Sequence, residues 1–511
     1  MNPKIFPIFK VVALALLSIL AVIEIQAQNT PFTSEDALNI KSFRVSEITK
    51  NGDFLAGTIS SSKDRLNVDH SRFGDPNYVS PRGSDVVILD VAKEEFIPIT
   101  GEKVILRGMK WSPDNQTLAL VLYKEEAFRL FLYDLKKSKL KELSLKTEKD
   151  LASNTLIEWT PDGENIIMSF REEGWKEKAD SMYREATVGP VTVYDSKRPF
   201  LKWDEIRNFS SKSLLAKVNI QSGKVSELLP EGSYSNIQLT KAGSSLIYQE
   251  NFSLKTVYNR EPGSESSLMM IDWNDQSKQD TLIKKSKKRI RTNWNKERDH
   301  FAYADSGKIF VRSIYEDEGI KVSQDTTEII KKDTSKVKFS IVRWSPDGNF
   351  VVASSKKGYW MLDIKNKTQE MVYEFPEDKE KAPSISISEW SPDGKFWYMS
   401  YSANDKWERG LMLYDLDSKT MKELVKDENL YSGWNLTEDG SRLFYNFSDG
   451  DHPAELFVTN PEFSSSKQLT DFNPWIKNKK LTRSELVKYM DSDGKELYGI
   501  LYYPVDYEPG K

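Results

Sequence analysis

Nucleophilic catalysis in this chain would depend on a serine, because the 511 residues include no cysteine. A catalytic serine is often presented by the pattern Gly-x-Ser-x-Gly, at a sharp turn between a strand and a helix. No glycine in the sequence begins that pattern. Gly243-Ser-Ser245-Leu-Ile247 and Gly263-Ser-Glu-Ser-Ser267 come nearest, and neither completes it. The sequence therefore predicts no nucleophilic centre within residues 1–511.

The sequence gives equally little support for acid–base catalysis or for metal binding. A Ser–His–Asp arrangement needs a histidine as its base, and the chain has only three, His70, His300 and His452. They lie far apart in the sequence, and no two have the spacing of metal ligands. We therefore predict no catalytic residue, no metal site and no cofactor in this chain.

A repeated five-residue phrase predicts the architecture that surrounds these residues. The clear copies are Trp111-Ser-Pro-Asp-Asn115, Trp159-Thr-Pro-Asp-Gly163, Trp344-Ser-Pro-Asp-Gly348 and Trp390-Ser-Pro-Asp-Gly394, and weaker echoes end at Gly52, Gly243 and Gly440. In the last clear copy, residues 385–390 alternate apolar and polar as a half-buried strand does. Pro392, Asp393 and Gly394 suit successive positions of a type I turn.

Three further strands are predicted after that turn, over residues 396–401, 410–416 and 421–425. Four antiparallel strands make one blade of a β-propeller, so the fold class is all-β with WD40-like repeats. Eight blades are predicted, at 42–100, 104–146, 153–230, 234–285, 289–333, 338–378, 384–428 and 432–472. Seven blades remain an alternative, because blade one is weak and Trp294-Asn-Lys-Glu-Arg298 of blade five lacks the Pro and Gly. Each motif Trp is expected to pack between adjacent blades.

Two segments interrupt the repeat. Blade three carries an insertion at 171–212, predicted to form a helix as far as Ala186 and then irregular chain through Pro190, Asp195, Pro199 and Trp203. A substrate-facing arm, a dimer contact and a solvated excursion all stay open for it. The basic run from Lys284 to Arg291 is interpreted as a solvated loop, with an anion or envelope-surface contact as the alternative.

Residues 1–27 are predicted to be a secretory signal peptide. Lys4 and Lys10 precede an apolar run from Val11 to Ile23, and a cut after Ala27 fits the small-residue rule. An uncleaved membrane anchor is the alternative. Export without disulfides indicates a bacterial periplasm or cell envelope. The net charge of −4 predicts no nucleic-acid partner.

The end of the sequence departs from the blade pattern. Residues 484–490 and 495–503 are predicted strands joined by a turn at Asp491-Ser-Asp-Gly494. The Trp-Ser-Pro-Asp-Gly blades, followed by Tyr489-Met-Asp-Ser-Asp-Gly494 and Gly499-Ile-Leu-Tyr-Tyr-Pro504, resemble the prolyl oligopeptidase family of serine peptidases. The dipeptidyl-peptidase-IV and acylaminoacyl-peptidase branches look nearest.

The resemblance implies a propeller followed by an α/β-hydrolase domain. The propeller would span 31–472, and 473–511 would form a linker and the first strands of the second domain. The catalytic serine, aspartate and histidine would then lie beyond Lys511, so the chain alone is predicted to be inactive. The dipeptidyl branch holds the substrate amino terminus with an acidic pair that precedes such a turn. Glu172-Glu173 follows its turn, so this role is not transferred.

The function predicted from the resemblance is the substrate-gating propeller of an exported serine exo- or oligopeptidase that acts on short peptides. A homodimer stays open, and a membrane contact is expected only with an uncleaved N-terminus. The alternative is a stand-alone TolB-type envelope propeller that binds a protein or peptide. A propeller glycosidase or lyase is disfavoured, because no paired-acid motif accompanies the repeats.

Overall fold

The computed structural model describes residues 30–189, 191, 197–256, 263–287, 290–325, 327–330, 333–378, 382–404, 406–505 and 507–508. Several predictions fall outside these residues: the signal peptide, Pro190 and Asp195 of the insertion, Lys288 and Arg289 of the basic run, and residues 509–511. Among the described residues, no helix combines the length and apolar character needed to cross a bilayer.

The repeated motif forms the predicted turn. In the copy at Trp390, the Gly394 N–H donates to the Ser391 carbonyl oxygen at 2.9 Å, and Gly394 has a φ of +80°, which favours glycine. The Ser391 hydroxyl donates to the Asp393 carboxylate at 2.6 Å and accepts from the Phe396 N–H at 2.8 Å. The motif thus satisfies its own polar groups and starts the next strand.

Each repeat folds as one four-stranded antiparallel sheet. Blade 1 contains β2 (Lys41–Ile48), β3 (Phe54–Ser61), β4 (Asp85–Asp90) and β5 (Glu95–Pro98). Blade 2 contains β6 (Ile105–Trp111), β7 (Thr117–Lys124), β8 (Ala127–Asp134) and β9 (Lys139–Glu142). Blade 3 contains β10 (Glu158–Trp159), β11 (Asn165–Phe170), β12 (Ser213–Asn219) and β13 (Val225–Gly232). Blade 4 contains β14 (Tyr234–Leu239), β15 (Ser245–Ser253), β16 (Ser264–Asp272) and β17 (Gln279–Ser286).

The second half of the ring repeats this pattern. Blade 5 contains β18 (Thr292–Trp294), β19 (His300–Asp305), β20 (Lys308–Ser313) and β21 (Ile320–Lys321). Blade 6 contains β24 (Ser340–Trp344), β25 (Phe350–Ser354), β26 (Gly358–Asp363) and β27 (Gln369–Glu374). Blade 7 contains β28 (Ser384–Trp390), β29 (Phe396–Ser402), β30 (Arg409–Asp415) and β31 (Thr420–Asp427). Blade 8 contains β32 (Leu430–Leu436), β33 (Leu443–Ser448), β34 (Glu455–Thr459) and β35 (Lys467–Gln468).

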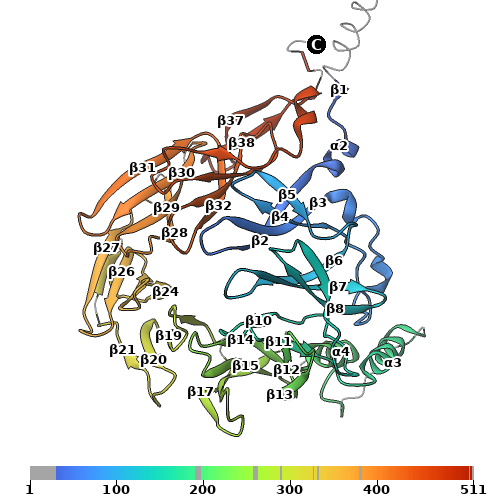
Figure 1. The fold of residues 1–511 in the computed structure, drawn as a ribbon. Coiled ribbons are helices and arrows are strands. Elements are labelled where there is room, and N and C mark those ends of the chain that lie inside the picture. The colour runs from blue at the N-terminus through green and yellow to red at the C-terminus, as the bar shows by residue number, and fades with distance from the viewer. Residues whose placement is uncertain are drawn as a thin grey trace, which may run out of the picture.

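The eight sheets stand in a ring, which confirms the predicted all-β propeller (Figure 1). Blades 1 and 5, whose motifs are degenerate, are both complete four-stranded sheets, so the seven-blade alternative is wrong. The turn of blade 5 forms without Pro or Gly, because Arg298 takes the left-handed position with a φ of +58°.

Hydrophobic clusters fill the seams between neighbouring blades. Trp159 of blade 3, for example, packs in one cluster with Ala119 of blade 2. Its indole N–H donates to the Lys110 carbonyl oxygen of blade 2 at 3.1 Å, and that of Trp344 donates to Asn293 of blade 5 at 2.8 Å. The predicted packing of the motif Trp between blades is therefore confirmed.

The ring closes by side-chain packing, since blades 1 and 8 each use four strands consecutive in the chain. Leu55 of blade 1 and Phe444 of blade 8 share one hydrophobic cluster. Arg442 of blade 8 donates to the Gly52 carbonyl oxygen at 2.8 Å and pairs with Asp53 at 2.9 Å. Closure thus depends on packing between the strands of blades 1 and 8, and the turn at Gly52 and Asp53 adds polar contacts to it.

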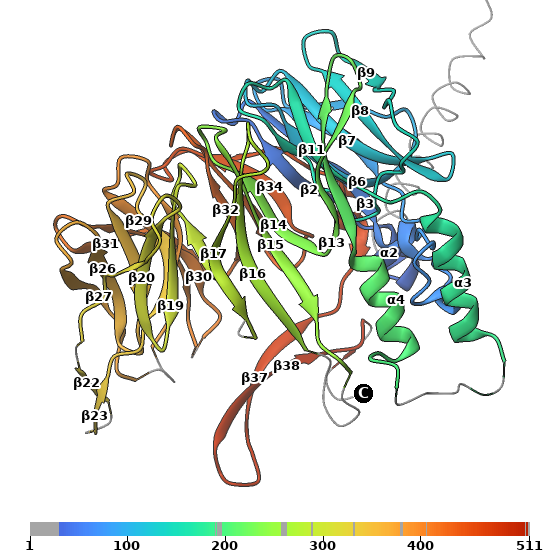
Figure 2. The same ribbon diagram turned by 90° about the horizontal axis from the view of Figure 1, so that it is seen from below.

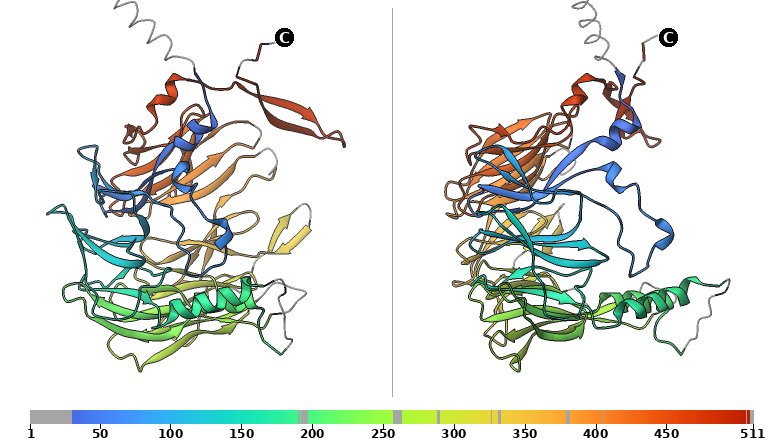
Figure 3. Two further views of the ribbon diagram at one scale, coloured as in Figure 1. Left: turned by 90° about the vertical axis from the view of Figure 1, so that its right-hand side faces the viewer. Right: turned by 45° about the vertical axis from the view of Figure 1, so that its right-hand side comes forward.

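The antiparallel order gives the propeller two different faces. The turns between strands one and two, and between strands three and four, lie on one face, which we call the turn face. The connections between strands two and three, and between blades, lie on the other, which we call the loop face. Helices α3 (Trp175–Thr187) and α4 (Lys202–Ser211) and the hairpins β22–β23 (Thr327–Ile330, Asp333–Lys336) and β37–β38 (Ser484–Met490, Glu496–Tyr502) project from the loop face (Figures 2 and 3). The short helices η1 (Ser62–Arg65) and η2 (His70–Arg72) belong to a loop-face connection of blade 1.

The insertion of blade 3 is more regular than predicted. The predicted helix forms as α3, but the expectation of irregular chain through Trp203 is wrong, because Trp203 lies in α4. The two helices pack together, with the Trp175 and Phe209 rings stacked at 5.2 Å between centroids. Tertiary packing of this kind stabilises short helices whose own propensity is weak.

Chain segments from both ends meet beside blade 8. β1 (Thr30–Pro31) pairs in parallel with β36 (Lys479–Lys480), and α2 (Ser34–Asn39) and η3 (Pro474–Asn478) flank them. The Asn473 side chain accepts from the Lys41 N–H at 2.9 Å and donates to the Lys41 carbonyl oxygen at 2.8 Å. Ile476 is buried. Contacts with the propeller therefore continue beyond residue 472.

Two truncations test the value of these contacts. A chain ending at Leu481 keeps Asn473 and Ile476, whereas a chain ending at Asp471 loses both. We expect the shorter chain to be less stable by about 1–3 kcal/mol, because Lys41 and neighbouring groups lose hydrogen-bond partners. Urea unfolding of both chains measures the difference. Equal free energies of unfolding would show that these contacts contribute nothing to the propeller.

Candidate binding site on the loop face

The three histidines lie apart in the fold. His70 belongs to η2 of blade 1, His300 to β19 of blade 5, and His452 to the connection between β33 and β34 of blade 8. The Nδ1 atoms of His300 and His452 lie 2.8 and 2.9 Å from carboxylate oxygens of Asp299 and Asp449. Within the described ranges, no three His, Asp or Glu side chains are grouped as metal ligands would be.

The other residues weighed from the sequence also lie apart. Ser245 and Ser267, from the nearest approaches to Gly-x-Ser-x-Gly, are buried in β15 and β16. Glu172 pairs with Lys149 at 2.6 Å, whereas Glu173 is exposed. The basic run begins on β17, where Lys285 pairs with Glu265 at 3.1 Å. The structure brings none of these groups into one site.

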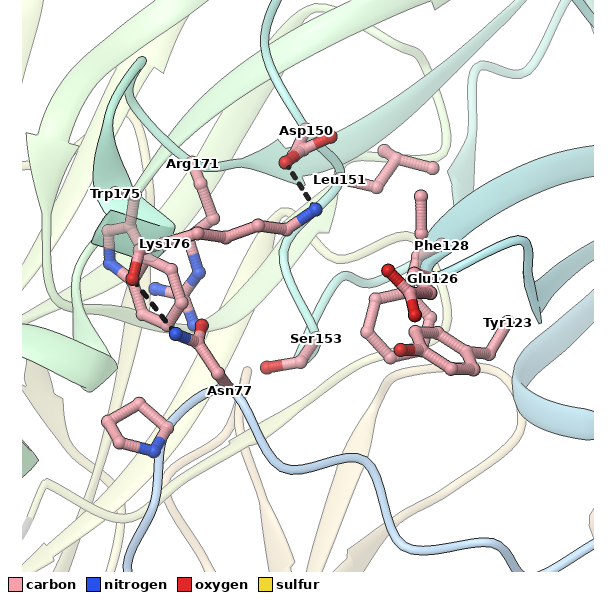
Figure 4. Close-up of a pocket in the computed structure, with 12 residues that line it drawn as sticks. Asn77, Tyr123, Glu126, Phe128, Asp150, Leu151, Ser153, Arg171, Trp175 and Lys176 are labelled. Carbon is pink, nitrogen blue, oxygen red and sulfur yellow. Dashed lines mark hydrogen bonds and ion pairs between the residues drawn. The ribbon is translucent and has the colours of Figure 1, made fainter. Parts of the chain in front are cut away.

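A pocket on the loop face instead lies where blades 1, 2 and 3 meet. Its walls come from the adjoining ends of β7 and β8 and from the connections that follow β3, β9 and β11, and its volume is about 50 Å³. Figure 4 shows Arg171, Trp175 and Asn77 on one side and Tyr123, Glu126 and Phe128 on the other. The pocket is lined by Pro76, Asn77, Tyr123, Glu126, Ala127, Phe128, Asp150, Leu151, Ser153, Arg171, Trp175 and Lys176.

Arg171 is the buried charge of this pocket. It follows β11 directly, at the root of the insertion, and only 4 % of its surface is exposed. Its guanidinium lies 4.2 Å from the centroid of the Trp175 ring, and one Nη donates to the Lys212 carbonyl oxygen at the other root of the insertion. The second Nη lies 3.4 Å from Asn154 Oδ1. These contacts hold the guanidinium in one orientation.

Arg171 stays charged despite its burial, because the pKa of its guanidinium remains well above neutral pH. Desolvation lowers the pKa of the guanidinium to about 10, and the carboxylate of Glu231 opposes that shift. Arg171 is therefore protonated at neutral pH. Sequence reasoning missed this residue, because it was read only as the start of an insertion. Its one sequence signal is a charged residue placed directly after the apolar strand 165–170.

The first strands of the blades, such as β2, β10 and β28, lie nearest the axis of the ring (Figure 1). Glu158 of blade 3 is buried and pairs with Lys110 at 3.0 Å and Arg298 at 2.5 Å. Between blades 4 and 5, a channel-wall cavity of about 590 Å³ is lined by Ser235, Asn236, Ile237, Gln238, Gln249, Ile290, Arg291, Thr292 and Trp294.

Blade 5 makes contacts across the channel at the turn face. Its turn residue Lys296 pairs with Glu438 of blade 8 at 3.2 Å, and Arg298 pairs with Glu158 of blade 3. Blade 5 adjoins only blades 4 and 6, so neither contact runs along the ring. The degenerate turn of blade 5 thus bridges the turn-face side of the channel, which is a role its altered sequence did not predict.

A test of channel electrostatics follows from Glu47 on β2. Desolvation raises the pKa of the Glu47 carboxyl, although Lys110 nearby opposes the shift. A raised folded-state pKa stabilises the fold at low pH, and that stabilisation is lost as pH rises through the folded pKa. Glu47→Gln is therefore expected to be more stable than the parent at pH 7, with the difference shrinking towards pH 4.5. Urea unfolding across this range measures it, and a variant no more stable at pH 7 would contradict the assignment.

Comparisons with known proteins give structural likeness only. No family model and no curated protein matches the chain. A solved prolyl endopeptidase is 11 % identical with a TM-score of 0.45, covering 91 % of this chain and 55 % of that protein. An acylaminoacyl peptidase solved with Z-Gly-Gly-Phe-chloromethyl ketone is 14 % identical with a TM-score of 0.45, covering 94 % and 60 %. The Pyrococcus horikoshii acylaminoacyl peptidase is 14 % identical with a TM-score of 0.45, covering 93 % and 59 %. The chain thus spans less than two thirds of each of these structures.

Proposed function

We propose that this chain is the propeller portion of an exported serine peptidase of the prolyl oligopeptidase type, which acts on short peptides. A hydrolase domain would sit on the loop face, and the propeller would restrict access to it. The resemblance of the blade motifs and the 484–504 segment to that family supports this proposal. The catalytic groups would belong to the second domain, so the described residues would contribute access and binding.

The observation that carries the proposal is the hairpin β37–β38 after blade 8. It projects from the loop face as a two-stranded sheet (Figure 3). Its large apolar side chains are exposed. Those at least 43 % exposed are Leu486, Tyr489, Met490, Tyr498, Ile500, Leu501 and Tyr502. An isolated hairpin is marginally stable in water, and an apolar one needs further strands or a helix to cover it. A hydrolase sheet would supply that cover.

The contacts between chain ends support the same arrangement. β1 and β36 place the segment that enters the propeller beside the segment that leaves it. The pair is reinforced by an ion pair between Asp36 and Lys479 at 2.9 Å. A domain attached at this point would therefore be held by two chain segments rather than by one flexible linker.

The mass of the native protein in its source cells tests the proposal. An antibody against the propeller is expected to detect a protein well above 58.8 kDa, the mass of the 511 residues. That longer protein should hydrolyse short peptides and leave folded proteins intact, whereas the chain ending at Lys511 should hydrolyse neither. A native mass near that of the signal-cleaved chain would overturn the peptidase assignment and favour the stand-alone binding propeller.

A further inference from the structure

Charges on the first strands of the blades are separated along the axis of the ring. These strands carry three carboxylates, Glu47 of β2, Glu158 of β10 and Glu389 of β28. Each stands directly before the residue at the motif Trp position, at the end of its strand nearer the turn face. Lys110 interacts with Glu47 and pairs with Glu158 at 3.0 Å, and Arg343 pairs with Glu389 at 3.7 Å. The loop-face half of the first strands therefore contains no carboxylate.

Three arginines stand nearer the loop face than these carboxylates. Arg44 lies in β2, Arg107 lies in β6, and Arg291 directly precedes β18. All three residues are exposed, and none forms an ion pair with a described residue. Arg107 contacts the ring of Phe128, with 5.2 Å between the guanidinium and the ring centroid. Because the first strands lie nearest the axis with a blade on either side, exposed side chains on them open to the space around the axis (Figure 1).

Two cavities flank the arginine of blade 5. One, of about 590 Å³, lies between blades 4 and 5, and the other, of about 280 Å³, lies between blades 5 and 6. Arg291 and Thr292 line both, and Arg291 is the only charged residue among the described residues of their walls. β18 has only three residues, whereas β14 and β24 beside it have six and five. The short strand leaves this space in the wall around the axis.

The donors in these cavities are accessible and suit a carboxylate. Arg291 is exposed, and Thr292 is half-buried. The Thr292 hydroxyl oxygen accepts from the Trp294 indole N–H at 3.0 Å and donates to no described residue, so its hydrogen is available to a ligand. Hydrogen bonds from a guanidinium to a carboxylate are roughly twice as strong as those between neutral groups. The larger cavity also falls within the range of roughly 300–1,000 Å³ that is usual for ligand pockets.

We propose that the cavities beside Arg291 bind an acidic side chain of a peptide that lies along the axis, and that Arg44 and Arg107 attract such peptides from the loop-face side. Charges of one sign in a cleft concentrate ligands of the opposite sign. The choice of a peptide as ligand rests on the proposed function. The carboxylate chemistry rests on the three arginines and the two cavities.

Binding of matched peptides to the 511-residue chain tests the site. Acetyl-Ala-Glu-Ala-Glu-Ala amide and acetyl-Ala-Gln-Ala-Gln-Ala amide have nearly the same shape and differ in charge. At about 0.01 M salt, calorimetry is expected to show at least about tenfold tighter binding of the Glu peptide. The ratio should fall at about 1 M salt, where charges are screened beyond about 3 Å. Equal binding of the two peptides at low salt would overturn the proposal.

A variant and its matched control locate the preference. Arg291→Gln is expected to reduce the Glu-to-Gln ratio to less than about threefold, because the charged donor is lost. Arg184→Gln changes an arginine of α3 that pairs with Asp180 away from the axis, and should leave the ratio unchanged. If Arg291→Gln does not fold, Arg291→Lys keeps the charge without the planar fork and should still lower the ratio. A preference that survives the change at Arg291 would overturn the site.

The double variant Arg44→Gln, Arg107→Gln tests the attraction of peptides to the axis. Charges outside a contact mainly change association rates. Stopped-flow fluorescence is therefore expected to show association of the Glu peptide slowed by at least about threefold, with dissociation nearly unchanged. Unchanged association would contradict the role of these two arginines.

A third peptide distinguishes a side-chain carboxylate from a terminal one. Acetyl-pentaalanine as the free acid carries its only carboxylate at the C-terminus. Tighter binding of this acid than of the Glu peptide amide would overturn the assignment to a side chain. None of these measurements requires hydrolysis, so failure of the site is separate from failure of the peptidase assignment, which the native mass decides.

Discussion

Trp390→Ala is expected to lower the free energy of unfolding by about 3–5 kcal/mol, the range for large buried aromatic side chains. Trp390 is 8 % exposed and shares a hydrophobic cluster with Val352 of blade 6. Its ring meets that of Trp397 edge to face, at 5.6 Å between centroids. Truncation would leave a cavity at the seam between blades 6 and 7. Urea unfolding followed by near-ultraviolet circular dichroism measures the loss.

Trp407→Ala is the matched control. Trp407 belongs to the same blade, but it is 44 % exposed in the connection between β29 and β30. Its removal should change the free energy of unfolding by less than about 0.5 kcal/mol, as is usual at the surface. Losses of similar size in the two variants would contradict the packing role of the motif Trp.

Gly52→Ala should destabilise the propeller at the point where the ring closes. Gly52 has a φ of +72°, and an added Cβ would lie 2.7 Å from Thr437 Cγ2 and 2.9 Å from the Phe444 ring of blade 8. The left-handed conformation costs about 1–2 kcal/mol for a residue with a Cβ, and overpacking adds about 1–3 kcal/mol. The expected total is about 2–5 kcal/mol, measured by urea unfolding.

Gly348→Ala separates the two contributions. Gly348 occupies the same turn position in blade 6, with a φ of +74° and no atom within 4 Å of an added Cβ. Its cost should be only the backbone penalty of about 1–2 kcal/mol. The excess at Gly52 then reports the contact between blades 1 and 8. An equal cost at both glycines would mean that this contact does not hold the ring closed.

The blades were predictable because their information is local. Ser391, Asp393 and Gly394 satisfy one another through hydrogen bonds within six residues, and the strands on either side alternate in the pattern of half-buried sheet. Such features can be recognised in a short stretch of sequence. Seven of the predicted blade ranges accordingly match the observed sheets closely, and even the weak echo at Gly52 marked a true blade. The range predicted for blade 5, 289–333, is wrong at its end, because the sheet ends at Lys321 and β22–β23 form a separate hairpin.

The second helix of the insertion was not predictable in the same way. Residues 202–211 begin without a side-chain cap, and their sequence has no strong helical signal. The helix is stabilised by contacts that lie far away in the chain. Phe209 stacks on Trp175, and Asp204 accepts a hydrogen bond from the Thr256 hydroxyl at 2.7 Å. The sequence pattern of residues 202–211 includes neither Trp175 nor Thr256, so it could not predict these contacts.

By itself, the sequence determined the repeat, the four-stranded blade and the packing role of each motif Trp, because turns and strand alternation depend on neighbouring residues. The choice of eight blades over seven needed the structure of the ring. The tertiary structure alone decided which polar groups meet. Arg171 and Trp175 became a pocket only when connections from three blades converged, and Lys296 met Glu438 only when the ring closed. Contacts between residues more than a hundred positions apart depend on the geometry of the whole ring, and no local pattern encodes them.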